Sequence, residues 1–221
     1  LRKSSKRQMG VSPRLTTRNL KNFYHRSRAR IFAKRLVKWP ADKPVVSFTF
    51  DDFPRTALTV GGQILNCHGV AGTYYASFGL LGTKSPTGEI FSRDDLFDLL
   101  TNGHEIGCHT FDHLDAGNTD AMSFEESINK NIMFAADLLP AHTITTFSYP
   151  KSMPSPGIKL IAGKYFIGCR GGGQKNNRQL VDLNLINSYF IDYKNNRNID
   201  ALIDAINKNI HEKGWLVFST H

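Results

Sequence analysis

The sequence predicts an α/β fold built on a parallel sheet, closed as a barrel or open. Strand-like and helix-like segments take turns along most of the chain, in about seven β-then-α units. Regular alternation of this kind is typical of parallel sheets, whose neighbouring strands are joined by helices. With 221 residues, of which 40% are hydrophobic, the chain is long enough for one large domain with a continuous core.

The expected strands are short apolar runs rich in β-branched and aromatic residues. In chain order they are "VVSFTF" (residues 45–50), "GTYYAS" (72–77), "HEIGC" (104–108), "ITTFSY" (144–149), "YFIGC" (165–169), "LINSYFI" (185–191) and "WLVFS" (215–219).

The expected helices lie between these strands, at residues 60–67, 92–103, 123–139, 155–165 and 199–211. Ser92 is the expected N-cap of the second helix, and Gly103 follows its end. Ser123 and Glu126 have the spacing of a capping box, which predicts that the third helix begins there.

Charge divides the chain into a basic N-terminal extension, residues 1–40, and a body, residues 41–221. The extension holds 13 Lys or Arg and no acidic residue, whereas the body holds 15 basic and 19 acidic residues. Leu20, Phe23, Tyr24 and Ile31 recur at helical spacing within the extension, as in a helix lying on an anionic membrane surface. A solvated basic arm that packs its few apolar residues on the body is the favoured alternative.

Three further patterns limit the function classes. The body has no basic stripe with interleaved aromatic residues, so no nucleic acid partner is expected. Cys67, Cys108 and Cys169 lack CxxC spacing and sit in apolar surroundings, which favours buried free thiols. Because no apolar run is long enough to span a bilayer and no signal-peptide pattern appears, a cytoplasmic location is expected, with membrane association through the extension as a further expectation.

Polar residues gather where expected strands end, which is where parallel barrels place their chemistry. Asp51 and Asp52 follow the first strand, "GCHTFDH" carries His109 and His113 after the third, and His221 follows the last. His109 and His113 have the i, i+4 spacing that, on a helical turn, places two imidazoles on one side. Two histidines and one aspartate would leave positions open on a metal ion for water and substrate, as catalytic metal sites do.

The motifs "TFDD", "HTFDH" and "WLVFSTH", in this order, resemble those of the polysaccharide deacetylase family, the NodB-homology domain of carbohydrate esterase family 4. The resemblance covers about residues 44–221. It implies a distorted (β/α) barrel of seven or eight parallel strands, a divalent metal, usually zinc, and hydrolysis of N-acetyl groups on the amino sugars of a polysaccharide or glycolipid. It also implies that relatives continue past the last motif through a further loop and helix.

The resemblance assigns a role to each matching residue. Asp52, His109 and His113 are the implied metal ligands, Asp51 is the implied general base, and His221 is the implied general acid. The matching third motif, "SYPKS", departs from the family pattern, because Ser148 stands where an arginine is usual. Tyr149 and Lys151 are the expected residues on the substrate side of this motif, with the Lys151 N–H serving the oxyanion.

Two other residues are expected to complete the site. Arg170 is the expected replacement for the missing arginine, which pairs with the base aspartate in the family, and a surface loop position is the alternative. Asp182 is the expected partner of the acid histidine. His104 precedes its strand and is expected to be a hydrogen-bonded structural histidine.

Two alternative functions stay open from the sequence. The same barrel can host hydrolysis of other non-peptide C–N bonds, such as those of cyclic ureides, and the atypical third motif keeps this alternative open. A non-catalytic protein that binds glycan or a membrane surface is the other, with the basic extension as its working part.

Overall fold

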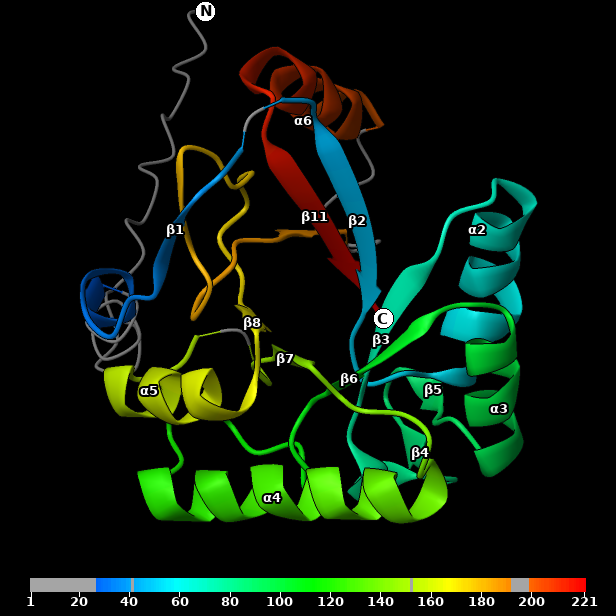
Figure 1. The fold of residues 1–221 in the computed structure, drawn as a ribbon. Coiled ribbons are helices and arrows are strands. Elements are labelled where there is room, and N and C mark those ends of the chain that lie inside the picture. The colour runs from blue at the N-terminus through cyan, green and yellow to red at the C-terminus, as the bar shows by residue number, and fades with distance from the viewer. Residues whose placement is uncertain (1–26, 41, 152, 192–198) are drawn as a thin grey trace, which may run out of the picture.

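A seven-stranded parallel sheet forms the centre of the molecule (Figure 1). The computed structural model describes residues 27–40, 42–151, 153–191 and 199–221. The strand order is β10-β11-β2-β3-β6-β7-β8, and every neighbouring pair is parallel. The strands are β2 (Val45–Phe50), β3 (Gly72–Ala76), β6 (Glu105–Cys108), β7 (Thr146–Ser148), β8 (Gly168–Arg170), β10 (Tyr189–Phe190) and β11 (Trp215–Thr220).

The sheet curls into a half-barrel, which confirms the predicted distorted barrel of parallel strands. One segment, residues 183–190, is hydrogen-bonded to both edges of the sheet. At one edge, the Ile186 N–H donates to the carbonyl of Cys169 in β8, and at the other, β10 pairs with β11. This bridging segment, which ends in edge strand β10, therefore links β8 to β11 across the open side of the half-barrel.

Helices cover the outer face of the curled sheet, as Figure 1 shows. They are α2 (Gln63–Cys67), α3 (Arg93–Thr101), α4 (Ala121–Leu138), α5 (Pro156–Tyr165) and α6 (Ile199–Glu212), with a π-helical segment, η1 (Ala57–Gly62), running into α2 and a 3₁₀ turn, η2 (Phe78–Leu80), after β3. The main core lies between these helices and the strands. Its largest fully buried members are aromatic, among them Tyr74, Phe91, Phe124 and Phe147.

Two small sheets lie outside the barrel. The antiparallel pair β4 (Lys84–Ser85) and β5 (Gly88–Glu89) forms a hairpin before α3. The second pair joins β1 (Leu36–Lys38) to β9 (Leu180–Asp182), also antiparallel. The predicted extension thus contributes a strand to the described structure.

Residues 27–40 pack on the body through polar contacts. The Arg35 guanidinium donates to the carbonyls of Gly163, Phe166 and Ile167. The fully buried Lys159 of α5 donates to the carbonyls of Ala29 and Phe32. Ile31, in the helical turn at residues 27–31, is 63% exposed. Leu20, Phe23 and Tyr24, the other members of the predicted amphipathic helix, lie outside the described residues.

Local signals in the sequence predicted some boundaries and missed others. Ser92 caps α3 and Gly103 adopts a φ of +78° just past the helix, both as predicted, and Asp95 completes a capping box with Ser92 that was not predicted. The boundary predicted for α4 is wrong, since Asp120 caps this helix by accepting from the Ser123 N–H. An aspartate serves as an N-cap as well as a serine does, and here it lies three residues earlier.

Two other expectations need correction. "YFIGC" is not a strand from its first residue, because Tyr165 is the last residue of α5 and β8 begins at Gly168. All three cysteines are free, but only Cys108 and Cys169 are buried, while Cys67 is exposed at the end of α2. The His104 imidazole is buried and its Nδ1 accepts from the Gly72 N–H, which confirms its structural role.

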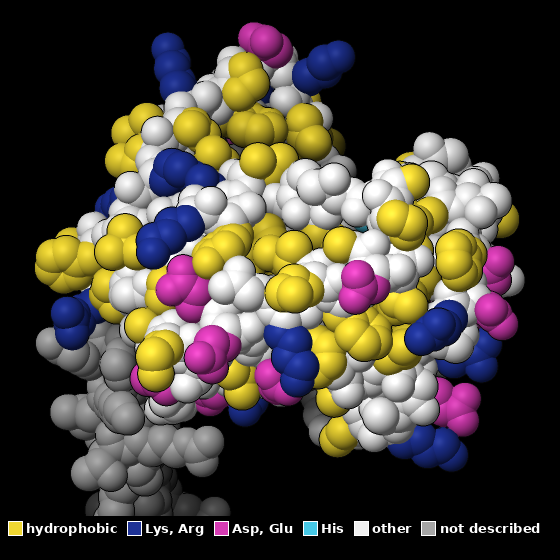
Figure 2. Space-filling view, turned by 60° about the horizontal axis from the view of Figure 1, so that its bottom comes forward, with side chains coloured by type: hydrophobic (Ala, Val, Ile, Leu, Met, Phe, Trp, Pro, Cys, Tyr) yellow, Lys and Arg dark blue, Asp and Glu magenta, His cyan; other side chains and the backbone are white. Residues whose placement is uncertain are grey.

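The surface on the α4 side is mixed in character. Figure 2 shows Lys and Arg side chains scattered among Asp and Glu and hydrophobic side chains on this face. Exposed Met122 and Met133 of α4 are among its hydrophobic residues. Among the residues described here, no helix is both long enough and apolar enough to cross a membrane.

The buried ion pair between Lys159 and Asp182 yields a prediction about stability. Lys159 Nζ lies 2.7 Å from Asp182 Oδ2 and also donates hydrogen bonds to the carbonyls of Ala29 and Phe32. Lys159→Met would leave a largely buried carboxylate without its counter-charge, so we expect a loss of about 3 kcal/mol in the free energy of unfolding, measured in urea.

Lys164→Met is the matched control for this change. Lys164 lies in the same helix, its side chain is exposed, and its pair with Glu125 spans 3.7 Å. We expect that variant to stay within about 0.5 kcal/mol of the wild type. Equal losses for the two variants would show that the buried lysine does not fasten residues 27–40 to the barrel.

Candidate metal centre and flanking acid–base residues

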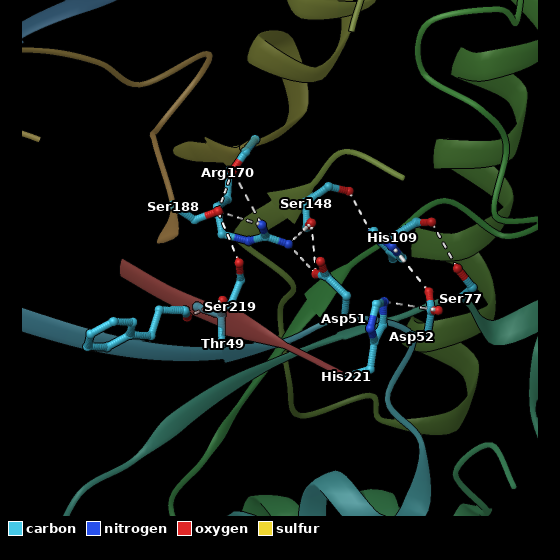
Figure 3. Close-up of polar contacts among 12 residues, drawn as sticks. Thr49, Asp51, Asp52, Ser77, His109, Ser148, Arg170, Ser188, Ser219 and His221 are labelled. Carbon is cyan, nitrogen blue, oxygen red and sulfur yellow. Dashed lines mark hydrogen bonds and ion pairs between the residues drawn. The ribbon is translucent and has the colours of Figure 1, made fainter. Parts of the chain in front are cut away.

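The two adjacent aspartates stand where β2 leaves the sheet, between β11 and β3. The Asp51 N–H still donates to the Thr220 carbonyl of β11, so Asp51 continues the ladder. Asp52 and Phe53 then adopt φ values of +61° and +49°. This left-handed turn is costly for residues with a Cβ, by roughly 1–2 kcal/mol each, and such strain is concentrated at functional sites. Its effect is to send the two carboxylates in different directions, as Figure 3 shows.

His109 and His113 lie on a loop rather than on the predicted helical turn. Residues 109–120 contain no helix, and Thr110 and His113 have φ values of +59° and +51°. The loop is held by α4, because Ser127 Oγ accepts from the Phe111 and Asp112 N–H groups. The two imidazole rings nevertheless come together, with centroids 5.1 Å apart.

Asp52, His109 and His113 form the only candidate metal cluster found among the described residues. One ligand atom from each lies within 4.8 Å of the others. Asp52 Oδ1 is 3.4 Å from His109 Nε2 and 3.1 Å from His113 Nε2. Burial would raise the pKa of Asp52, but the two adjacent imidazoles outweigh it and hold the pKa well below the usual range.

The residues present fit a divalent cation. Asp52 Oδ1 is buried and has no hydrogen-bond partner among the described residues, although two imidazole nitrogens face it. His109 Nδ1 lies 2.8 Å from the Ser148 carbonyl, which fixes the tautomer that carries the proton on Nδ1. Nε2 of His109 is therefore free to act as a ligand, and such a carbonyl contact is the usual outer support of a metal-binding histidine. Two nitrogens and one oxygen suit zinc, and also cobalt, manganese or iron.

Asp51 sits beside this cluster in a buried ion pair. Its side chain is almost fully buried, and Oδ1 accepts from Ser148 Oγ and from Nη2 of Arg170. Burial alone would raise the pKa of Asp51, but the charge of Arg170 outweighs it and the pKa lies below the ordinary value. Oδ2 takes part in no hydrogen bond with the described residues. One oxygen is thus held in place while the other is left open.

Arg170 lies where the sequence predicted it, buried at the end of β8 rather than on a surface loop. Its Nη2 also donates to Ser148 Oγ. Its Nη1 donates to Ser188 Oγ, at 3.1 Å, and Ser188 in turn lies 3.1 Å from Ser219 Oγ (Figure 3). These two serines were not predicted from the sequence. The available signal was a hydroxyl residue within each of two apolar segments, "LINSYFI" and "WLVFST".

His221 stands on the open side of the cluster. Its Nε2 is 3.7 Å from Asp52 Oδ2, and its side chain is 40% exposed. The ring makes an edge-to-face contact with Phe190, with centroids 5.2 Å apart. The structure therefore places this imidazole beside the candidate metal ligands and in contact with solvent.

Tyr149 and Asp182 have roles other than the expected ones, and for Lys151 the structure shows only where the residue lies. The Tyr149 side chain is buried in the core, where its hydroxyl donates to the Asn184 carbonyl, so it cannot face a substrate. Asp182 is occupied by Lys159 and by the backbone N–H groups of Arg35 and Asn184, not by His221. Lys151 is exposed at a φ of +59°, and its use of the backbone N–H stays a prediction.

Fold and site together define a class: an α/β half-barrel with a candidate metal centre at the carboxyl ends of its strands. The chain matches the family model described as polysaccharide deacetylase over residues 38–165, more than half of its length. The chain therefore belongs to the polysaccharide deacetylase family. No curated protein sequence matches it.

Several solved structures are similar to this chain. IcaB from Ammonifex degensii aligns with a TM-score of 0.59 and 16% identity, covering 84% of this chain and 88% of IcaB. The deacetylase PplD from Streptococcus pyogenes, solved in complex with acetate, aligns with a TM-score of 0.61 and 18% identity, covering 88% and 78%. The pseudoenzyme BA3943 from Bacillus anthracis aligns with a TM-score of 0.57 and 14% identity, covering 81% and 56%. At these identities the likeness concerns the fold.

The geometry of the cluster predicts how the chain binds metal. We expect close to one zinc ion per chain, and we expect His113→Ala to weaken zinc binding by at least roughly 100-fold, because it removes one of three protein ligands. Competition with a chromogenic chelator measures both quantities. His68→Ala, an exposed histidine outside the cluster, should bind zinc like the wild type. Equal affinities for wild type and His113→Ala would contradict the assignment.

Proposed function

We propose that this protein is a metal-dependent hydrolase that removes N-acetyl groups from the amino sugars of a polysaccharide or glycolipid. One observation carries the proposal. The cluster of Asp52, His109 and His113 is flanked on one side by a buried, arginine-held carboxylate and on the other by an exposed imidazole. Amide hydrolysis needs these three components: a site for a Lewis acid, a base for the attacking water and an acid for the leaving amine.

A divalent cation at this site, with zinc as the proposed one, would lower the pKa of a water molecule and polarise the carbonyl of the acetamide. The chain's own groups would carry out the proton transfers. Asp51 Oδ2, the oxygen that Arg170 and Ser148 leave open, would accept the proton of the attacking water. Because Arg170 and Ser148 hold the other oxygen, the carboxylate is oriented before the substrate arrives.

His221 would donate a proton to the leaving amine. An amine leaves poorly unless it is protonated, so a positioned acid contributes on the order of 10²- to 10⁴-fold. The imidazole stands on the opposite side of Asp52 from the buried histidine and reaches solvent, from which it can regain its proton. The edge-to-face contact with Phe190 would keep the ring upright while its nitrogen faces the substrate.

The position of Arg170 weakens the two alternatives. Ser148 is the departure that kept a different C–N bond open as the target, and Arg170 from the neighbouring strand would compensate for it, because its guanidinium contacts Asp51. A non-catalytic binder would not need a buried carboxylate oxygen held by both Arg170 and Ser148. The pseudoenzyme BA3943 shows that the same fold also exists without activity, so turnover is the decisive measurement.

Substitution of the proposed base and acid tests the mechanism. In the zinc-loaded protein we expect Asp51→Asn to lower acetate release from N-acetylglucosamine oligomers by at least roughly 10³-fold, and His221→Ala by roughly 10²- to 10⁴-fold. Both variants should keep zinc, because neither residue is a proposed ligand. His211→Ala, at the exposed end of α6, is the matched control. Acetate release by Asp51→Asn at the wild-type rate would contradict the proposal.

Substitutions at positions 148 and 170 test whether the guanidinium of Arg170 orients Asp51. Ser148 and Arg170 are directly paired between β7 and β8, so their side chains emerge beside each other. We expect Arg170→Ser to lower kcat by roughly 10- to 100-fold with little change in KM, because the base loses its orientation.

The double variant Ser148→Arg with Arg170→Ser restores the family's usual arrangement and should recover part of that loss. Ser148→Arg alone is the control, because it adds an arginine without removing the native one. Full activity in Arg170→Ser would show that Asp51 does not depend on the guanidinium.

A further inference from the structure

A cavity of about 420 Å³ lies inside the half-barrel, on the side of Arg170 that faces away from Asp52. Its lining comes from the inward-pointing residues of β2, β3, β6, β7, β8 and β11 and from the bridging segment 183–190. Nothing in the proposed reaction uses this space. The cavity is nevertheless large enough for a small organic molecule.

The two walls of the cavity differ in chemistry. One wall is polar and comes from β3, β6 and β7, where Thr73, Glu105 and Thr146 point inward. The opposite wall is apolar and includes Ile186, Trp215 and Val217, which belong to a small hydrophobic cluster separate from the main core. A ligand that fits both walls has one hydrogen-bonding edge and one apolar face.

Glu105 is the charged group of the polar wall. Its two oxygens accept from Thr146 Oγ1 at 2.6 Å and from Thr73 Oγ1 at 2.8 Å, which fixes the carboxylate while leaving lone pairs on both oxygens. No ion pair among the described residues involves it. A half-buried carboxylate without a counter-charge is a ready partner for a cation.

Arg170 closes the inner end of the cavity. Its Nη atoms are engaged by Asp51, Ser148, Ser188 and a carbonyl, but its buried Nε donates no hydrogen bond within the described structure. Buried N–H groups are rarely left without an acceptor. A ligand oxygen at this end would supply one.

We propose that this cavity binds a small hydroxylated amine, of the chemical class of a single amino sugar, with its ammonium against Glu105 and an oxygen toward Arg170. The apolar face of the sugar ring would lie against the wall that contains Trp215 and Val217. The inference does not depend on the proposed deacetylation, because none of the three metal-ligand side chains lines the cavity.

The tryptophans of the chain provide the readout. There are two, and they stack on each other, with centroids 5.4 Å apart and Trp215 lining the cavity. A ligand in the cavity should therefore change the intrinsic fluorescence. Neither tryptophan belongs to the candidate metal centre, so binding at that centre is not expected to mimic the signal.

The experiment is a fluorescence titration of the full chain with glucosamine below neutral pH, where its amine is charged. We expect a saturable change with a Kd of roughly 1 mM, in the metal-free protein and in His109→Ala alike. N-acetylglucosamine, which has no ammonium, should bind about 10-fold more weakly. Glu105→Gln should remove that difference. Equal binding of the two sugars to the wild type would overturn the assignment of the ammonium to Glu105.

A cavity-filling variant locates the signal. Val217→Phe places a larger side chain on the apolar wall and should abolish the response, whereas Val60→Phe, the same change at an exposed position of η1, should leave it intact. Circular dichroism confirms folding, and Thr146→Met fills the cavity from the opposite wall if Val217→Phe does not fold. Absence of any response in the wild type, or a full response in a folded filled variant, would overturn the proposal.

Discussion

The left-handed turn at Asp52 is the constraint on which the candidate site depends. Asp51 is still part of the β2 ladder, held by the Thr220 carbonyl, so its side chain points inward to the barrel axis. The reversal of φ at the next residue then carries the Asp52 carboxylate over the rim to the loop of His109 and His113. Without this turn, one carboxylate could not reach Arg170 while its neighbour reaches His109 and His113. The core around Phe53, which is fully buried against Tyr74 and Phe91, holds the backbone in this conformation.

Arg170 and Ser148 reach the same oxygen of Asp51 from two neighbouring strands. Ser148 of β7 and Arg170 of β8 are partners in adjacent strands, roughly 5 Å apart. An arginine side chain is long enough to cover that distance, and the small serine leaves it the room. The serine hydroxyl also donates to the same oxygen of Asp51. Ser188 and Ser219 then complete the surroundings of the guanidinium.

The sequence was sufficient for the parts of the structure that depend on local pattern. Alternation of apolar strands and capped helices predicted the parallel sheet, and the position of Asp52, His109 and His221 after strand ends predicted their convergence. It failed where long-range packing decides. The histidine loop looked like a helical turn by spacing alone, whereas Ser127 of α4 sets its shape. Tyr149 was expected beside the substrate because of its place in the third motif, but its ring, just after β7, packs in the core against Phe147.

The interior cavity also depends on long-range packing, so the sequence did not predict it. A barrel filled by large inward-facing residues would have no free space at this level, and here the polar wall consists of two threonines and one glutamate. Gly107 allows Tyr75 to lie flat, since a Cβ at that position would be 2.4 Å from the ring. Small side chains at alternate positions of separate strands carry no local signal. Their sum becomes visible only when the sheet curls and bridging segment 183–190 joins its two edges, because only then do these side chains face one another across a common space.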